Sequence, residues 1–225
     1  MEKIGPFMEV AHSLYSPLTK FNWDIGVLFN AVRDSEVHLS GWPIGVVLTR
    51  EGATPKARKF GLKSKIVSKS DGMFDYWELH KDGKFYFKRT IEEAVMNFDG
   101  SPAKEKVLLF DTRIRRITEA LLHCQKLYEN LNIDPKQTIH FSINHFDLNG
   151  RILTAGSRTR SFSRRYDCVE DVHKFDGIYS IELIVADLNG IVYQITKNLF
   201  ELFNWFDYQK SVCDDIVDKF LEGKY

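Results

Sequence analysis

The chain has 225 residues, of which 44% are apolar and 13% aromatic, and its 31 basic and 31 acidic side chains give a formal net charge of zero. This composition excludes a disordered chain and predicts a fold with a substantial core. The apolar runs are far shorter than the ~20 residues that cross a bilayer, so no membrane partner is expected.

Cysteine usage and the N-terminal segment both predict a cytoplasmic protein. Cys124, Cys168 and Cys213 are odd in number and widely spaced, which predicts three free, packed thiols rather than a disulfide framework. The first ten residues contain an acid and lack the basic and apolar pattern of a secretory signal.

The zero net charge hides a segregated distribution. Residues 50–69 and 151–165 hold twelve of the 31 Lys and Arg residues and only one acid, Glu51. The rest of the chain is therefore acidic. Because the local field, rather than the total charge, attracts a polyanion or an acidic partner, these two segments are the strongest indication of function.

The first part of the chain predicts one helix followed by strands. Asn22 can cap a helix, and apolar residues then repeat at helical spacing as far as Val32. Strands are expected at 41–49 and 62–68. The basic segment 50–61 between them is rich in Gly and Pro and is expected to be a loop.

An aromatic hairpin is expected next. The dipeptide Asp82-Gly83 lies between two aromatic-rich runs and predicts a two-residue turn within residues 74–87. A short helix is expected at 90–97, followed by a polar loop at 99–105.

The strongest helical pattern covers 112–131, with Asp111 or Thr112 as its cap. Glu119 and His123 are expected on its polar side. The apolar stripe consists of residues three and four positions apart: Ile114, Ile117, Leu121, Cys124, Tyr128 and Leu131. Leu122 alone falls off this pattern.

Two further strand predictions follow the long helix. Alternating apolar residues and the dipeptide Asn149-Gly150 predict a second hairpin over 137–156. A strand is expected at 177–186, because Tyr179, Ile181, Leu183 and Val185 alternate with polar residues.

Two helices, at 187–206 and 208–222, are expected to close the chain. Hairpins with helices before, between and after them predict an α+β fold with a largely antiparallel sheet and four to five helices, including this C-terminal pair. No linker or internal repeat divides the sequence, so residues 1–225 are expected to form a single α+β domain.

Four strings resemble, in the same order, a region of bacterial Schlafen-type, AlbA-like DNA-binding proteins. They are WDIGVLFNAVRDSEVHLSGWPIGVVLTREGATPKARKFG (23–61), FDYWELHKDGKFYF (74–87), LFDTRIRRITEALLHCQKLYENL (109–131) and LFELFNWFDY (199–208). The similar region lies C-terminal to the Schlafen/AlbA-like module, and no segment here resembles that module. The resemblance implies a companion domain, or a free-standing relative, in nucleic-acid-linked regulation or defence. It implies no catalytic residue.

The two basic segments are the candidate nucleic-acid-binding site. The first contributes Arg50, Lys56, Arg58, Lys59, Lys63 and Lys65. The second contributes Arg151, Arg158, Arg160, Arg164 and Arg165. Guanidinium groups and neighbouring hydroxyls bind phosphate oxygens, and Phe162 can stack on a base. We expect both segments to converge into one positive face that contacts phosphates, with binding driven by the shape and charge of the nucleic acid rather than by its base sequence.

A different interpretation of the same residues is intramolecular. Residues 166–225 contain twelve Asp or Glu residues against five Lys and no Arg. The second basic segment would then be a solvated loop that pairs with this acidic region.

Catalytic interpretations are weaker. Asp75, Asp82 and Lys84 loosely fit the spacing of a metal-dependent nuclease, but the hairpin turn explains Asp82 better. His140 and His145 are five apart in a strand and so face opposite sides, which argues against a shared metal. No zinc motif, phosphate loop or GxSxG elbow is present. We therefore expect no cofactor and no metal.

The aromatic segment 199–208 has two interpretations. Its rings exceed what one helical stripe can hold, which fits a helix buried on several sides. The same rings could instead form an apolar contact with a partner protein or a second copy, through Phe203, Trp205 and Phe206.

The sequence therefore predicts a non-catalytic binding or regulatory module of a bacterial nucleic-acid-associated system. The first alternative is a protein-interaction or oligomerisation domain. A weaker alternative is a hydrolase in which the Arg residues hold a phosphorylated substrate.

Overall fold

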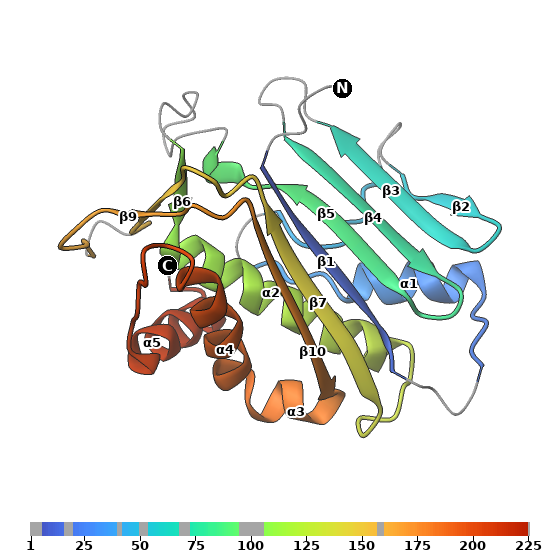
Figure 1. The fold of residues 1–225 in the computed structure, drawn as a ribbon. Coiled ribbons are helices and arrows are strands. Elements are labelled where there is room, and N and C mark those ends of the chain that lie inside the picture. The colour runs from blue at the N-terminus through green and yellow to red at the C-terminus, as the bar shows by residue number, and fades with distance from the viewer. Residues whose placement is uncertain are drawn as a thin grey trace.

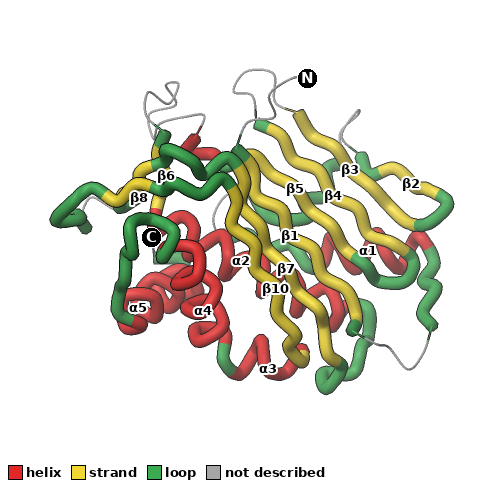
Figure 2. The backbone as a smooth tube through the Cα atoms, in the orientation of Figure 1, coloured by secondary structure: helices red, strands yellow, loops and turns green. Residues whose placement is uncertain are grey.

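The computed structural model describes residues 6–15, 20–39, 42–49, 54–67, 73–94, 106–156 and 160–224. They form an α+β fold with a seven-stranded antiparallel sheet, a three-stranded sheet and a set of helices (Figures 1 and 2). The predicted fold class is confirmed, including the helical pair near the C-terminus.

The large sheet contains β1 (Phe7–Leu14), β2 (Lys56–Arg58), β3 (Gly61–Val67), β4 (Phe74–His80), β5 (Phe85–Thr90), β7 (Thr138–Phe146) and β10 (Val172–Ser180). Its strand order is β10-β7-β1-β5-β4-β3-β2, so β10 and β2 lie at its two edges. The small sheet contains β6 (Val107–Leu109), β8 (Ile152–Thr154) and β9 (Tyr166–Asp167).

The described helices are α1 (Ile25–Asp34), α2 (Phe110–Asn130), α3 (Ile181–Ala186), α4 (Leu188–Phe200) and α5 (Lys210–Leu221). A 3-10 turn spans Glu92–Ala94. The long helix α2 is central, because α1, α4 and α5 all pack against it. Among the described helices, none is both long and apolar enough to span a bilayer.

The helices cover one face of the large sheet. In Figure 1 the strands lie in front of α1 and α2, so the viewer looks onto the other face. Buried and half-buried residues alternate along β1 and β7: Val10 and Ile143 point into the core, whereas Glu9 and Asn144 point away from it. Within the described residues no helix packs on this second face, which we call the uncovered face.

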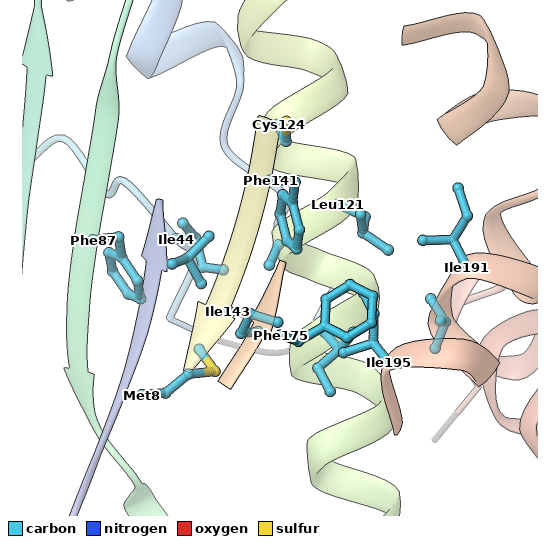
Figure 3. Packing of buried hydrophobic residues seen from close by; sticks show 14 of the residues in the cluster. Met8, Ile44, Phe87, Leu121, Cys124, Phe141, Ile143, Phe175, Ile191 and Ile195 are labelled. Carbon is cyan, nitrogen blue, oxygen red and sulfur yellow. The ribbon is translucent and has the colours of Figure 1, made fainter. Parts of the chain in front are cut away.

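Apolar side chains fill the space between the sheet and α2. In Figure 3, Phe141 and Ile143 of β7 point toward α2, while Ile191 and Ile195 of α4 lie on the side of α2 near Leu121. All five side chains are buried. This helix-on-sheet layer is the hydrophobic core that the apolar stripe of α2 predicts.

Buried ion pairs join α2 and the sheet to their surroundings. Arg113 of α2 donates to Glu93 at 2.9 Å, and Arg89 of β5 donates to Asp75 of β4 at 2.8 Å. All four side chains are buried. Because a buried charge is strongly destabilising once its partner is lost, these pairs restrict the positions that α2 and β5 can take.

The strand expected at 41–49 is absent from residues 42–49. This segment runs beside α2, and side chains satisfy its backbone groups. Arg116 donates to the carbonyl of Trp42 at 3.1 Å, and Glu119 accepts from the amide of Ile44 at 3.0 Å. Glu119 and His123 were expected on the polar side of the helix, but both are fully buried. That prediction is wrong because this segment covers the side of α2 that faces away from the apolar stripe.

Two strand predictions in the second half also need correction. The turn at Asn149-Gly150 is present, but β8 leaves β7 and pairs with β6 and β9 in the small sheet. The strand expected at 177–186 ends at Ser180, whose side chain accepts from the amide of Leu183 at 3.2 Å and caps α3. An N-cap of this kind favours a helix over a continued strand.

The other expected elements are largely in place. The first helix, the β4–β5 hairpin, the long helix and the two C-terminal helices are confirmed. The long helix begins at Phe110 rather than after an Asp111 or Thr112 cap. The basic segment expected as a loop contains β2. The loop expected at 99–105 and the end of 90–97 lie outside the described residues.

We predict that Leu121→Ala lowers the free energy of unfolding by about 2–5 kcal/mol, because Leu121 is fully buried between α2 and its neighbours. Leu122→Ala is the matched control, since Leu122 is only partly buried one position along the same helix. Urea unfolding measures the free energy of unfolding of each variant, provided that the m value is the same as in the wild type. Equal losses at the two positions would contradict this assignment of the core face.

Candidate anion-binding site

The β2–β3 hairpin presents four cations on the uncovered face. Lys56 pairs directly with Lys63 across the two strands, and Arg58 and Lys65 lie two residues away on the same side. Together with Thr54, Ser64 and Tyr76 they line a cavity of about 340 Å³. The hairpin thus concentrates most of the first basic segment in one place.

None of these four cations has a close ion-pair partner among the described residues. Within the described part of the chain, no carboxylate forms an ion pair with Lys56, Arg58, Lys63 or Lys65. Glu78 lies opposite Lys63 in the β3–β4 register and offsets part of the positive charge, although it forms no ion pair with Lys63. A compact group of unpaired cations attracts phosphate groups.

The carboxylate of Glu78 is held by its own strand. It accepts a hydrogen bond from the hydroxyl of Tyr76 and contacts His80 at 3.3 Å. Burial, together with this bond, raises the pKa of Tyr76 to about 12, and the bond lowers the pKa of Glu78. At neutral pH Tyr76 is therefore a protonated donor, and Glu78 stays charged beside the cavity.

Tyr76 is the aromatic residue in the lining of this cavity, and Phe60 and Phe74 lie on the adjoining strands and turn. Phe60 projects from the β2–β3 turn with 65% of its surface exposed, and the ammonium of Lys59 lies 5.2 Å from its ring centre. Lys65 lies 5.7 Å from the ring centre of Phe74, which stacks near Tyr76. Cations beside exposed rings are the combination that single-stranded nucleic acids bind.

A second hollow of about 310 Å³ lies on the uncovered face, among β1, β4, β5 and β7. Small side chains leave room for this hollow, and imidazole, ammonium and hydroxyl groups lie at its border. Its lining includes Ala11, Ser13, His80, Lys84, Tyr86, His140 and Ser142. These groups offer hydrogen bonds on the same face, and His80 contacts Glu78, which lies opposite Lys63 of the first cavity in the strand register.

The second basic segment behaves differently, because acids compensate much of it. Arg151 is only 2% exposed and donates to Asp147 at 2.8 Å, so its assignment to a phosphate-binding face is wrong. Arg160 donates to Asp111 at 2.8 Å and to Asp215 of α5 at 2.6 Å. The ion pair between Arg160 and Asp215 agrees with the alternative interpretation, in which the second basic segment pairs with the acidic C-terminal region.

The two basic segments do not share a face. Arg165 donates to Asp167 at 2.7 Å, and Arg164 lies over the ring of Tyr166 at 4.8 Å. In Figures 1 and 2, β9 and the β2–β3 hairpin lie at opposite sides of the molecule. The prediction that the two basic segments converge into one positive face is therefore wrong for the described residues. Arg50 and Arg158 lie outside them.

The aromatic segment near the C-terminus is mostly core. Phe203 and Phe206 are buried, so their assignment to a partner interface is wrong. Both fill the space beside α4 because the chain turns back there, with an isolated bridge between Phe203 and Cys168. Trp205 is 87% exposed and remains available for contact.

The candidate nuclease residues are separated. Asp75 faces the core and pairs with Arg89, whereas Asp82 lies at the hairpin tip and pairs with Lys84 at 2.9 Å. Among the described residues, no group of three or more His, Cys, Asp or Glu side chains is arranged to hold a metal ion.

Four histidines are buried between the large sheet and the helices, and the sequence patterns indicated burial for none of them. They are His12, His123, His145 and His173. The Nδ1 atoms of His145 and His173 lie 3.3 Å apart, so one of them donates to the other. Burial lowers the pKa of His123 to about 3 and that of His173 to about 4. All four are expected to be neutral at physiological pH.

Comparison with known protein families, with curated proteins and with solved structures gives no match to this chain. The similarity to the region beside Schlafen/AlbA-like modules therefore stays a prediction that depends on the four strings alone.

We predict that the free energy of unfolding falls as the pH is lowered from 7 toward 4. The unfolded chain takes up protons below the usual imidazole pKa of 6.5, whereas the folded chain excludes them until its lower pKa values are reached. The stability is thus fully present above that pH and is lost below it. Urea unfolding at pH 7 and pH 5 measures the difference.

The variant His123→Leu should reduce this difference between pH 7 and pH 5, because it removes one group that charges only on unfolding. His38→Gln is the control, since His38 is exposed. An identical pH dependence in the wild type and in His123→Leu would contradict the neutral buried state of His123.

Proposed function

We propose that this chain is a binding module that holds the phosphate groups of single-stranded nucleic acid on the uncovered face of its large sheet. The observation that carries the proposal is the cavity of Lys56, Arg58, Lys63 and Lys65, whose charges no described carboxylate pairs with. Three ammonium groups and one guanidinium fork provide many donors within one concave surface.

The rings beside the cavity favour a single strand over a duplex. Phe60 is exposed at the hairpin turn, and Phe74 and Tyr76 lie on the same face as Lys65. Unstacked bases can lie on such rings, whereas the bases of a duplex are already stacked on one another. Charge and stacking together predict binding with little sequence preference.

The proposed setting is a cytoplasmic, bacterial, nucleic-acid-associated regulatory or defence system, supported by the resemblance to Schlafen-type proteins. The module is proposed to be non-catalytic, because the carboxylates considered for a nuclease are engaged elsewhere. Asp75 pairs with Arg89 inside the core, and Asp82 pairs with Lys84 at the hairpin tip.

We predict that Lys63→Glu/Lys65→Glu weakens binding of a labelled 12-nucleotide single strand by roughly tenfold or more, because two charge-assisted phosphate contacts become repulsive. Fluorescence anisotropy at several salt concentrations measures it. With four cations on phosphates, the wild-type slope of log affinity against log salt should be about −3.

The matched control is Arg164→Glu/Arg165→Glu, which changes the charge equally but at the opposite side of the molecule. This variant should bind like the wild type. An equal loss in both double variants would show that charge in general, rather than the β2–β3 cavity, attracts the strand. Binding that is insensitive to salt would contradict phosphate contact altogether.

We predict a separate effect for Phe60→Ser. Loss of one stacking ring should weaken binding of the single strand by about 1–3 kcal/mol while leaving the folded hairpin intact, since Phe60 is exposed. Heparin, which has charge but no bases, should bind the variant and the wild type equally. A parallel loss for both ligands would contradict base stacking at Phe60.

A further inference from the structure

The edge strand β10 offers an open row of backbone groups. Within the described residues β10 pairs only with β7. Ile181 donates its amide to the carbonyl of Gln137 at 3.2 Å, and the register places Tyr179 opposite Ile139. In an antiparallel ladder these are hydrogen-bonded pairs, so the odd-numbered residues of β10 direct their backbone groups to β7.

The even-numbered residues of β10 therefore direct their N–H and C=O groups to the free edge. They are Val172, Lys174, Asp176 and Ile178. Their side chains all point to the uncovered face, because alternate residues of a strand share one side. An unprotected edge of this length is a template for pairing with another strand.

The order of these four side chains is self-complementary. If a second copy pairs antiparallel about a two-fold axis at Phe175, Lys174 lies opposite Asp176 of the second copy, and Asp176 lies opposite its Lys174. Val172 and Ile178 meet in the same way. Each facing pair joins even-numbered residues, whose backbone groups already point outward, so the ladder can form its hydrogen bonds without rearrangement.

The two charges also reject the neighbouring registers. A shift of the axis to residue 174 places Lys174 opposite itself, and a shift to residue 176 places Asp176 opposite itself. Both arrangements juxtapose like charges, which destabilises strand pairing. A shift to a point between two residues would turn the side chains of the second copy to the other face.

Exposed apolar side chains gather around the same edge. Ile178 on β10, Leu183 and Val185 on α3, and Val169 just before β10 are all exposed. The two-fold axis at Phe175 brings the start of α3 of the second copy toward Val169. Burial of these side chains adds an apolar contribution on either side of the paired strands.

We propose that two copies of this chain associate through β10, antiparallel about Phe175, to form one continuous antiparallel sheet. The dimer does not depend on nucleic-acid binding. It differs from the contact expected at Phe203, Trp205 and Phe206, because β10 provides directed backbone groups and paired charges. Asp176 contacts His140 of its own chain at 3.1 Å, yet its side chain is 62% exposed and can reach a second copy.

Charge reversal tests this register. Lys174→Asp places a carboxylate opposite Asp176 in both halves of the dimer, and Asp176→Lys places an ammonium group opposite Lys174. The dimer of each variant alone should have a dissociation constant roughly 30-fold higher than that of the wild type, because two attractive pairs become repulsive. Sedimentation equilibrium measures the dissociation constants. Lys219→Asp, an exposed charge reversal on α5, should dimerise like the wild type.

Mixing the two variants is the decisive step. In a mixed dimer both carboxylates of the Lys174→Asp copy face the two ammonium groups of the Asp176→Lys copy. Both ion pairs therefore return, and the affinity should approach that of the wild type. Recovery also shows that each variant is folded.

Three results would overturn the proposal. The first is a wild type that stays monomeric at about 100 µM, and the second is a mixture of the two variants that associates no more tightly than its components. The third is a dimer that Trp205→Ser dissociates and Lys174→Asp does not.

Discussion

The arrangement of this protein depends on the placement of its helices on one face of a seven-stranded sheet. The long helix α2 is buried along almost its whole length, and its Arg113 pairs with Glu93 away from water. A helix enclosed in this way cannot shift without separating buried charges. The second face of the sheet is consequently left to polar and aromatic side chains, and the candidate site lies there.

One-sided coverage also explains which basic residues stay available. Lys56 and Lys63 belong to a hairpin at the sheet edge, where alternation directs both side chains away from the core. Arg151 and Arg160 come from the region around the small sheet, where Asp147, Asp111 and Asp215 surround them. The same residue type thus serves binding at one side of the molecule and internal cohesion at the other.

Local signals in the sequence predicted the elements whose partners are close in the chain. The β4–β5 hairpin follows from Asp82-Gly83, and α2 follows from its apolar stripe. The pairing of β8 with β6 could not be predicted, because that contact joins segments far apart in the sequence. Residues 181–186 alternate like a strand, but the cap at Ser180 turns them into α3.

The candidate site was predictable only in part, because the sequence shows where the cations occur but not which carboxylates approach them after folding. Burial of His123 and Glu119 depends on residues 42–49 crossing a helix 75 residues further along the chain.

The most direct test of the account is a map of backbone amide shifts by nuclear magnetic resonance during titration with a 5′-phosphorylated single strand. The largest changes should fall on β2, β3 and the outward-facing residues of β4, with Tyr76 among them, while β9 stays unchanged. Shifts centred on residues 160–167, or on the helical side of the sheet, would contradict a phosphate site on the uncovered face.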